Sequence, residues 1–439
     1  MAATGVHQTE LLLYFTLLQL AIIVLAGRLG STVALRVGQT AAVGEIIVGI
    51  LLGPSLFGFM APDVFHYAFR SSSPEPMQML SQLGLILLMF QIGLEFDFSH
   101  LREKRNRTAV TRVAALSLVL PFALGLVFGY LSAPILSPSS NLMGSALFVA
   151  TAFSITALPI LGRILIDFGM TRAPLGVIAI SAAAINDVIG WMMLALVTAL
   201  TVANFDAGTF GLKVGLVLGF MLLCWYGVRP LLKRLVRQAN PRDGRLSNNL
   251  LGILLVAVFL AAMATYLLGI FAIFGGFMLG VILHDEPELV AAWKERIGQF
   301  VLVFFLPIFF TYTGLRTNIG GLDSVPLWGW CAATLLLATI GKFGGAYAAA
   351  RWSGLDHNEA SVLGILMKTR ALMELIIINV GLDLGVISQN MFTMLVIMAI
   401  VSTVVTTPGL NRWLPRTGFL PSARPARAAA PEATPAGGP

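Results

Sequence analysis

The sequence contains few charged residues and few of the residues that hold metals. Only 11% of its 439 residues are Asp, Glu, Lys or Arg, and it has two cysteines and five histidines. Cys224 and Cys331 lie far apart in separate apolar stretches, and the histidines show no ligand spacing, which argues against a disulfide or a structural metal site. No phosphate-binding loop ending in Gly-Lys-Ser or Gly-Lys-Thr occurs, which disfavours an ATP-driven pump. We therefore expect no cofactor, and no metal other than a transported ion.

Apolar residues make up 57% of the chain, and its mean hydropathy is +0.87, far above the range of soluble domains. Apolar runs of about 20 residues, long enough to cross a bilayer, recur along the chain. The predicted fold class is an all-α polytopic membrane protein with about thirteen transmembrane helices. The predicted spans are 11–27, 41–60, 77–96, 109–133, 142–164, 175–203, 208–228, 249–267, 268–283, 297–315, 325–350, 360–383 and 391–408.

The positive charge follows a pattern that favours a membrane over nucleic acid as the partner. The formal net charge is +7, and Lys and Arg concentrate on alternate predicted loops. By the positive-inside rule the N-terminus lies outside and the C-terminus in the cytoplasm. No basic segment precedes the first span, so we expect no cleavable signal. We expect a transmembrane domain over residues 1–413 and a disordered cytoplasmic tail, rich in Pro and Ala, over 414–439.

Two parts of the chain resemble each other. Residues 44–52 read GEIIVGILL and residues 275–283 read GGFMLGVIL, and the next spans end in GLEFD at 93–97 and GLRTN at 314–318. The two copies start seven spans apart, and an odd offset means that they cross the membrane in opposite directions. This pattern predicts inverted repeats, at about 41–203 and 268–408, with crossed discontinuous helices and a site near the midplane.

Asp187 is a single carboxylate in an otherwise almost uncharged apolar run. A charge at bilayer depth is costly, and its usual purpose is transport of ions or protons. We expect Asp187 to bind the transported monovalent cation or a proton. Asn186 beside it supplies a neutral amide, so one cation displaces at most one proton here.

Hydroxyl groups precede a proline in the predicted span 142–164. Ser154 and Thr156 stand just before Pro159, whose ring crowds the carbonyl one turn back, so the helix should open there. The freed carbonyls and both hydroxyls would suit a hard monovalent cation. An ordinary proline kink satisfied by Ser and Thr is the alternative.

Lys342 lies near the middle of an apolar run between small residues. Its amine should point inward and needs a carboxylate partner, for which Asp187 is the candidate. A buried pair titrates as a coupled unit, so a cation and a proton would compete for the carboxylate. That competition is the predicted mechanism.

Three ionisable residues interrupt the predicted span 360–383. Arg370 and Glu374 are four positions apart and share a helix face, which predicts a structural pair. Lys368 has no acid in register and could meet the C-terminal carbonyls of a broken half-helix. All three residues could be structural, or they could take part in coupling or charge compensation. Elsewhere within the spans, Glu45 could serve packing or an access path, and Gln91 could support the site as a donor.

Together these residues resemble the monovalent cation:proton antiporter-2 family. The most specific matches are residues 44–55, the pair Asn186-Asp187, and residues 368–376, whose form is similar to that of plant and fungal cation/proton exchangers and their bacterial relatives. The chain departs from the related glutathione-gated potassium efflux antiporters, because it lacks their long cytoplasmic nucleotide-binding domain. The resemblance implies a homodimer with a dimerisation domain and a mobile core that moves like an elevator.

The resemblance also assigns roles to residues of this sequence. It makes Asp187 the shared cation and proton carboxylate, Asn186 its neighbour, residues 154–156 the helix break and Lys342 the core lysine. An Asn-Asp pair is associated with electroneutral exchange, whereas a core lysine is linked to electrogenic members, so the stoichiometry stays open.

The predicted function is a secondary antiporter that exchanges Na+ or K+ for protons, and not an enzyme. The predicted location is the bacterial inner membrane. The alternative is an ion-coupled symporter or proton-coupled exporter of an organic solute on the same fold. The few polar positions within the spans argue against that alternative, and a single buried carboxylate argues against a channel.

Overall fold

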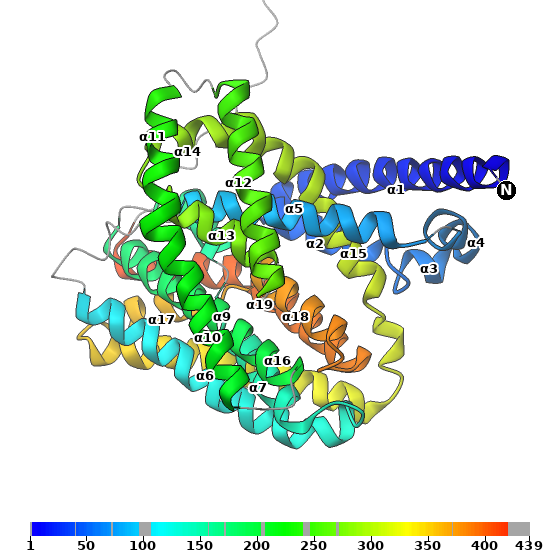
Figure 1. The fold of residues 1–439 in the computed structure, drawn as a ribbon. Helices are drawn as coiled ribbons and strands as arrows, with labels where there is room; N and C mark the ends of the chain where they lie inside the picture. The colour runs from blue at the N-terminus through cyan, green and yellow to red at the C-terminus, as the bar shows by residue number, and fades with distance from the viewer. Residues whose placement is uncertain are drawn as a thin grey trace, which may run out of the picture.

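The computed structural model describes residues 2–39, 41–71, 73–95, 107–156, 158–170, 173–202, 207–239, 246–268, 272–370 and 372–419. Every regular element among these residues is a helix, in agreement with the predicted fold class. Most helices have most of their contacts within one of two groups, which occupy the upper and lower parts of Figure 1. A long connector helix runs between the groups.

The scaffold group consists of α1 (Ala2–Arg36), α2 (Ala41–Leu51), α3 (Phe57–Met60), α4 (Pro62–Phe65), η1 (His66–Arg70), α5 (Glu75–Leu94), α12 (Asn248–Leu267), α13 (Ala272–Ile282), α14 (Pro287–Trp293), η5 (Lys294–Gly298), η6 (Val301–Phe305), α15 (Leu306–Arg316) and η7 (Ile319–Gly321). The core group consists of α6 (Arg107–Leu136), α7 (Leu142–Ser154), α8 (Leu158–Asp167), α9 (Pro174–Val202), α16 (Val325–Trp352), α17 (His357–Met367), α18 (Leu372–Asp383), α19 (Gln389–Trp413) and η8 (Leu414–Thr417). The connector consists of α10 (Ala207–Leu222), η3 (Leu223–Val228) and α11 (Arg229–Ala239).

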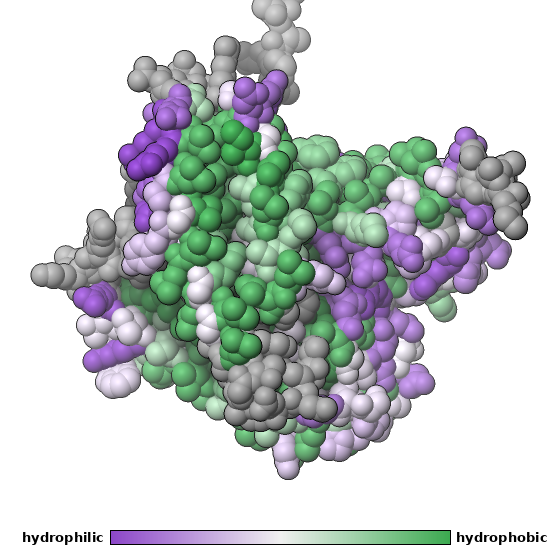
Figure 2. All heavy atoms as spheres, in the orientation of Figure 1, coloured by the Kyte–Doolittle hydropathy of each residue, from purple (hydrophilic) through white to green (hydrophobic). Residues whose placement is uncertain are grey.

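Nine helical stretches of the described residues are long and apolar enough to cross a membrane. Shorter apolar helices such as α7 and α13 account for further predicted spans, and the count of thirteen stays a prediction. Figure 2 shows an apolar surface over α12 and the adjoining part of α10, where large hydrophobic side chains such as Val256, Leu260 and Tyr266 are exposed. Such a face is suited to contact with lipid chains.

The first helix of each predicted repeat packs closely on the helix before it. A Cβ atom added to Gly44 of α2 would lie 2.2 Å from the Gly30 carbonyl oxygen of α1. A Cβ added to Gly275 of α13 would lie 2.2 Å from the Ala261 carbonyl oxygen of α12. Only a glycine allows this approach of two backbones, so α1–α2 and α12–α13 are equivalent pairs.

A second pair of contacts crosses between the repeats. A Cβ on Gly314 of α15 would lie 2.0 Å from the Gly49 carbonyl oxygen of α2, and one on Gly280 of α13 would lie 2.1 Å from the Phe90 carbonyl oxygen of α5. The sequence alignment equates α2 with α13 and α5 with α15. The contacts are therefore reciprocal, as expected for inverted repeats.

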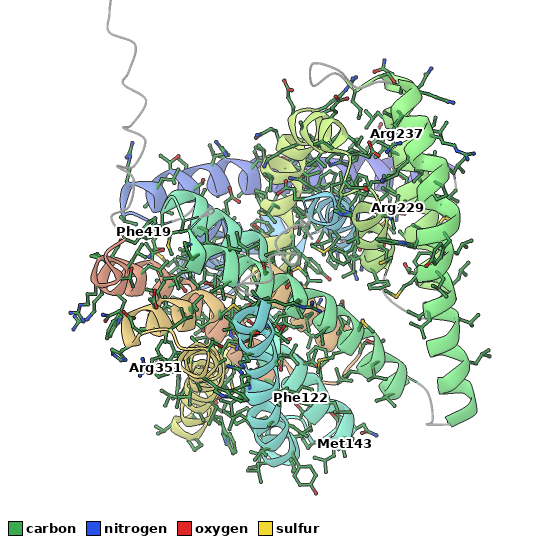
Figure 3. All side chains as sticks on the ribbon, turned by 90° about the vertical axis from the view of Figure 1, so that its left-hand side faces the viewer. Phe122, Met143, Arg229, Arg237, Arg351 and Phe419 are labelled. Atoms are coloured by element: carbon green, nitrogen blue, oxygen red, sulfur yellow. The ribbon has the colours of Figure 1, made fainter. Side chains whose placement is uncertain are left out.

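Three boundaries differ from or refine the prediction. The expected division at residues 268 and 269 is present, because α12 ends at Leu267 and α13 begins at Ala272. The basic segment after residue 228, predicted as a loop, is instead the helix α11, which Figure 3 shows continuing α10 with Arg229 and Arg237 along it. Its apolar positions Leu232 and Val236 are buried, which stabilises the helix. At the C-terminus, residues 414–417 are helical where a disordered tail was predicted, and residues 420–439 lie outside the described part.

Candidate functional site

The first helix break lies where the sequence predicted it. Helix α7 ends at Ser154, Ile155 is extended with φ −78° and ψ 147°, and α8 begins at Leu158. The Ser154 hydroxyl donates to the Ala150 carbonyl at 2.7 Å and is thus engaged within its own helix. The backbone carbonyls at the end of α7 are left for other partners.

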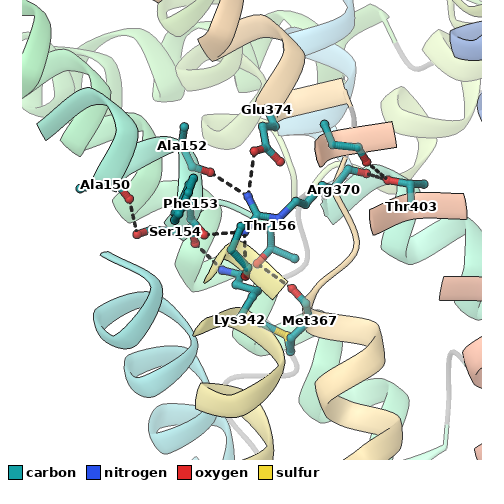
Figure 4. A network of polar contacts seen from close by, with 12 residues as sticks. Ala150, Ala152, Phe153, Ser154, Thr156, Lys342, Met367, Arg370, Glu374 and Thr403 are labelled. Atoms are coloured by element: carbon teal, nitrogen blue, oxygen red, sulfur yellow. Dashed lines mark hydrogen bonds and ion pairs between the residues drawn. The ribbon is translucent and has the colours of Figure 1, made fainter. Parts of the chain in front are cut away.

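A second break faces the first. Helix α17 ends at Met367 and α18 begins at Leu372. The Thr156 hydroxyl of the first break donates to the Met367 carbonyl at 3.4 Å, so the two interrupted helices cross at their breaks (Figure 4). Backbone of this kind is tolerated at membrane depth only where protein or a cavity surrounds it.

Two buried cations cap the C-terminal end of α7. Arg370 donates to the carbonyls of Ala152 at 2.9 Å and Phe153 at 2.7 Å, and the Lys342 ammonium donates to the Ser154 carbonyl (Figure 4). Positive charge is favourable at this end of a helix, where carbonyls lack intrahelical partners.

The contact of Lys368 with the C-terminal carbonyls of a broken half-helix, which the sequence left open, is not present among the described residues. Lys368 is the C-cap residue of α17, and its ammonium has no hydrogen bond or ion pair with any described residue. The longer guanidinium of Arg370, two positions further, reaches α7 instead.

The predicted pair between Arg370 and Glu374 is confirmed, with 2.8 Å between Nη1 and Oε1. Both side chains are fully buried or nearly so. Thr403 of α19 donates to the Arg370 backbone carbonyl at 2.7 Å and so fixes the second break. A buried ion pair of this kind holds its place only with such additional hydrogen bonds.

Asp187 lies on α9 next to the first break. Gly190, one turn later on the helix, packs on Ile155 so closely that a Cβ would lie 2.7 Å from its Cγ1 atom. Asp187 is 1% exposed, and neither carboxylate oxygen has a hydrogen-bond partner among the described residues. Its electrostatic neighbours are Lys342 and the backbone amide of Leu158 at the start of α8.

The predicted direct pair between Lys342 and Asp187 does not form. No ion pair within 4.0 Å joins them among the described residues, because the ammonium turns to the Ser154 carbonyl. The lysine still acts on the carboxylate through its field. Asp187 is thus left without an ion-pair partner among the described residues.

Asn186, the residue before Asp187 on α9, contacts α6. Its side-chain amide is fully buried and donates to the Ser117 hydroxyl of α6 at 2.9 Å, while its oxygen has no hydrogen-bond partner in the described part of the chain. Ser117 carries no charge and stands in a long apolar stretch, so no sequence signal singled it out. Thr403 was missed for the same reason, although it belongs to a cluster of hydroxyl residues on α19.

Two predicted residues lie on helices of the scaffold group. Gln91 donates to Glu95 at 3.2 Å and packs against Gly298. Glu45 is buried in α2, next to the close approach of that helix to α1. The structure therefore gathers the core residues at the crossing and leaves these two on α5 and α2.

Comparison with known proteins identifies the family. Residues 20–415 match the family described as sodium/hydrogen exchanger, transmembrane. The chain is 38% identical over 398 residues to the Na+/H+ antiporter NhaS4 of Synechocystis, covering 90% of this chain and 96% of that protein. It is 34% identical to cation/H+ antiporter 17 of Arabidopsis thaliana, covering 92% of this chain and 49% of that protein. It is 29% identical to K+/H+ antiporter 1 of Saccharomyces cerevisiae, covering 84% and 43%.

The chain spans about half the length of the plant and yeast relatives. Among solved structures, the sodium proton antiporter MjNhaP1 from Methanocaldococcus jannaschii has a TM-score of 0.64 at 13% identity, and the match covers 93% of this chain and 98% of that one. At this identity the likeness concerns the fold alone. The family match spans most of the chain, and the apolar helices agree with it: the chain is an integral membrane protein that belongs to the sodium/hydrogen exchanger family.

Proposed function

We propose that this protein is a secondary antiporter that exchanges a monovalent cation, Na+ or K+, for a proton at Asp187. The observation that carries the proposal is a fully buried carboxylate, without a hydrogen-bond partner among the described residues, beside two crossed helix breaks. The names of its relatives, Na+/H+ and K+/H+ antiporters, support the same substrates.

One carboxylate produces exchange because two positive species compete for it. A cation bound at Asp187 and a proton bound there each neutralise the same negative charge, and the low-dielectric surroundings disfavour both at once. Lys342 and Arg370 keep their own partners in the Ser154 carbonyl and in Glu374. Asn186, Ser154 and Thr156 line the surroundings of the site, where oxygen atoms replace the water lost by the cation.

Alternating access follows from the two groups of helices. The proposed site lies wholly within the core group, so that group would carry it past the scaffold group as an elevator. Polar contacts between the groups include an ion pair of Arg316 on α15 with Asp383 on α18 at 2.6 Å, and a hydrogen bond from Asn379 of α18 to the Thr313 hydroxyl of α15 at 2.7 Å. These contacts would part during the movement. A homodimer held through the scaffold group in the cytoplasmic membrane, with the N-terminus outside, completes the proposal.

The test is proton flux in liposomes that contain the purified protein and a trapped pH dye. Addition of Na+ or K+ should drive proton flux, and clamping the membrane potential should reveal the stoichiometry. We expect Asp187→Asn to abolish the flux, because the amide of asparagine does not bind and release a proton as a carboxylate does. Asp323→Asn, which changes an exposed carboxylate in a loop in the same way, should leave it unchanged. A wild-type signal equal to that of empty liposomes would refute the proposal.

A further inference from the structure

Ser117 is a buried hydroxyl group in the middle of α6, at the interface with α9. Its exposed fraction is 0%, and it contacts Asn186, the residue just before Asp187. The function proposed above does not use Ser117. Its hydrogen bonds nevertheless decide which end of the Asn186 amide is free.

The Ser117 hydroxyl has one hydrogen atom, and the Ala114 carbonyl accepts it at 3.3 Å. Toward Asn186 the hydroxyl can therefore act only as an acceptor. The Asn186 Nδ2 atom lies 2.9 Å from Ser117 Oγ and donates to it. This pairing directs the NH2 end of the amide toward α6 and leaves the oxygen end turned away from the serine.

The oxygen end of the Asn186 amide has no contact of this kind within the described part of the chain. Asn186 Oδ1 is buried without a hydrogen-bond partner, as are both oxygens of Asp187. Unpaired buried oxygens are costly in a folded protein, and their occurrence on two consecutive residues calls for a ligand. Carbonyl and carboxylate oxygens are the ligands that replace the hydration shell of a monovalent cation.

We propose that Ser117 is a positioning residue that holds the Asn186 amide with its oxygen available to the transported cation. The inference rests on the proposed function at Asp187 and adds Ser117 as a determinant of cation affinity. Without Ser117 the amide can reverse. An N–H group, which cannot coordinate a cation, would then stand where the oxygen was.

Ser132 provides a matched control on the same helix. It is also fully buried, and its hydroxyl donates to the carbonyl three residues back, Gly129, at 3.4 Å. It makes no other hydrogen bond with the described residues. A change of Ser132 to Ala therefore removes the same atoms from α6 without touching Asn186.

The experiment measures cation KM and maximum rate of exchange in liposomes, and cation binding to the detergent-purified protein by calorimetry. Ser117→Ala should raise the KM and the dissociation constant of the cation by roughly three- to tenfold, the usual effect of one hydrogen bond, with little change in maximum rate. Ser117→Thr keeps the hydroxyl and should bind like wild type, as should Ser132→Ala. Ser117→Cys fills the same space with a weak acceptor and should behave like Ser117→Ala.

The effect must depend on Asn186. In an Asn186→Ala background, Ser117→Ala should cause no further loss of binding, because the group that it positions is gone. An unchanged KM in folded Ser117→Ala and Ser117→Cys, or the same loss in both backgrounds, would overturn the inference while exchange by the wild type stands. A wild type that neither binds cations nor exchanges protons would instead refute the proposed function.

Discussion

Arg370 and Lys342 divide the open end of α7 between them, and this division determines the charge at the crossing. The guanidinium donates to two carbonyls of α7, those of Ala152 and Phe153, and pairs with Glu374. The ammonium donates to the Ser154 carbonyl of the same helix. Arginine suits the first task because its fork presents several donors in fixed directions. Arg370 and Lys342 therefore each have partners, whereas neither oxygen of Asp187 has a hydrogen-bond partner among the described residues.

Loss of Arg370 should strongly destabilise the fold. Arg370→Ala leaves Glu374 buried without its partner, which costs about 3–5 kcal/mol of the free energy of unfolding. Arg412→Ala is the control, since Arg412 is exposed on α19 and has no partner in the described part of the chain; we expect a change within about 0.5 kcal/mol. Denaturant unfolding in detergent compares the two variants. Equal effects would contradict the structural role given to Arg370.

At the scale of helices, glycines set the distances between the backbones of neighbouring helices. The contact of α2 with α15 brings two backbones together at Gly49 and Gly314. No side chain fits between them. The absence of a Cβ atom at these two glycines is therefore what allows the helices to pack this closely.

A methyl group at this contact should force the helices apart. Gly314→Ala should lower the free energy of unfolding by about 1–3 kcal/mol, the typical cost of overpacking. Gly329→Ala is the control in α16, because a Cβ there meets nothing within 4 Å, and it should stabilise the helix by up to about 1 kcal/mol. Thermal unfolding of both variants tests the difference, and a neutral Gly314→Ala would argue against so close a contact.

Helix α11 is fastened to the turn after α13 by a pH-sensitive ion network. Asp285 lies 2.8 Å from the Arg229 guanidinium and also bonds Lys233, while Glu286 lies 3.2 Å from Arg237. Burial raises the pKa of Asp285, but hydrogen bonds from Lys233 and Arg229 outweigh burial and hold the pKa below its usual value.

A lowered pKa in the folded state means that the charged form stabilises the fold. This contribution is complete above the ordinary Asp pKa of about 3.9 and is lost as the pH falls through the lower folded value. Asp285→Asn should therefore lower the unfolding temperature slightly at neutral pH, and the difference from wild type should vanish in acid. Thermal unfolding of both proteins at a series of pH values measures the difference in unfolding temperature. A difference that grows in acid would contradict the assigned direction.

At the scale of the whole molecule, the helices divide into two groups with a boundary between them. All the residues at the crossing belong to the core group, and α2 meets α19 across the boundary. At this boundary Gln39, which follows α1, donates to the Val404 carbonyl of α19 at 3.1 Å.

A covalent link across the boundary should stop transport. Gln39→Cys with Val404→Cys, joined by a cleavable bifunctional thiol reagent, should abolish exchange in liposomes until the link is cleaved. Asn358→Cys with Arg416→Cys joins two sites within the core group, where the Asn358 amide donates to the Arg416 carbonyl at 3.3 Å, and should leave exchange intact. Undiminished exchange by the fully linked first pair would exclude an elevator movement at this boundary.

Local features of the sequence were sufficient to predict the all-helical fold, the repeat, the break before Pro159 and the pair between Arg370 and Glu374. Each depends on residues close in sequence or on hydropathy alone: proline cannot donate to the helix, glycine admits a close neighbour, and residues four apart share a helix face. The sequence did not correctly predict contacts between residues that are distant in the chain. The sequence predicted Asp187 as the partner of Lys342, allowed Lys368 to meet the C-terminal carbonyls of a broken half-helix, and gave no sign of Ser117.

The tertiary structure decided these partners, since a buried polar group takes whichever donor or acceptor the packing brings within about 3 Å. Ser154 and Lys342 are 188 positions apart, and Ser117 and Asn186 are 69 apart. Composition and local pattern determined that a charge lies within the membrane and where the helices break. Only the crossing of the helices decided which of these charged groups pair, and that the Asp187 oxygens have no hydrogen-bond partner among the described residues.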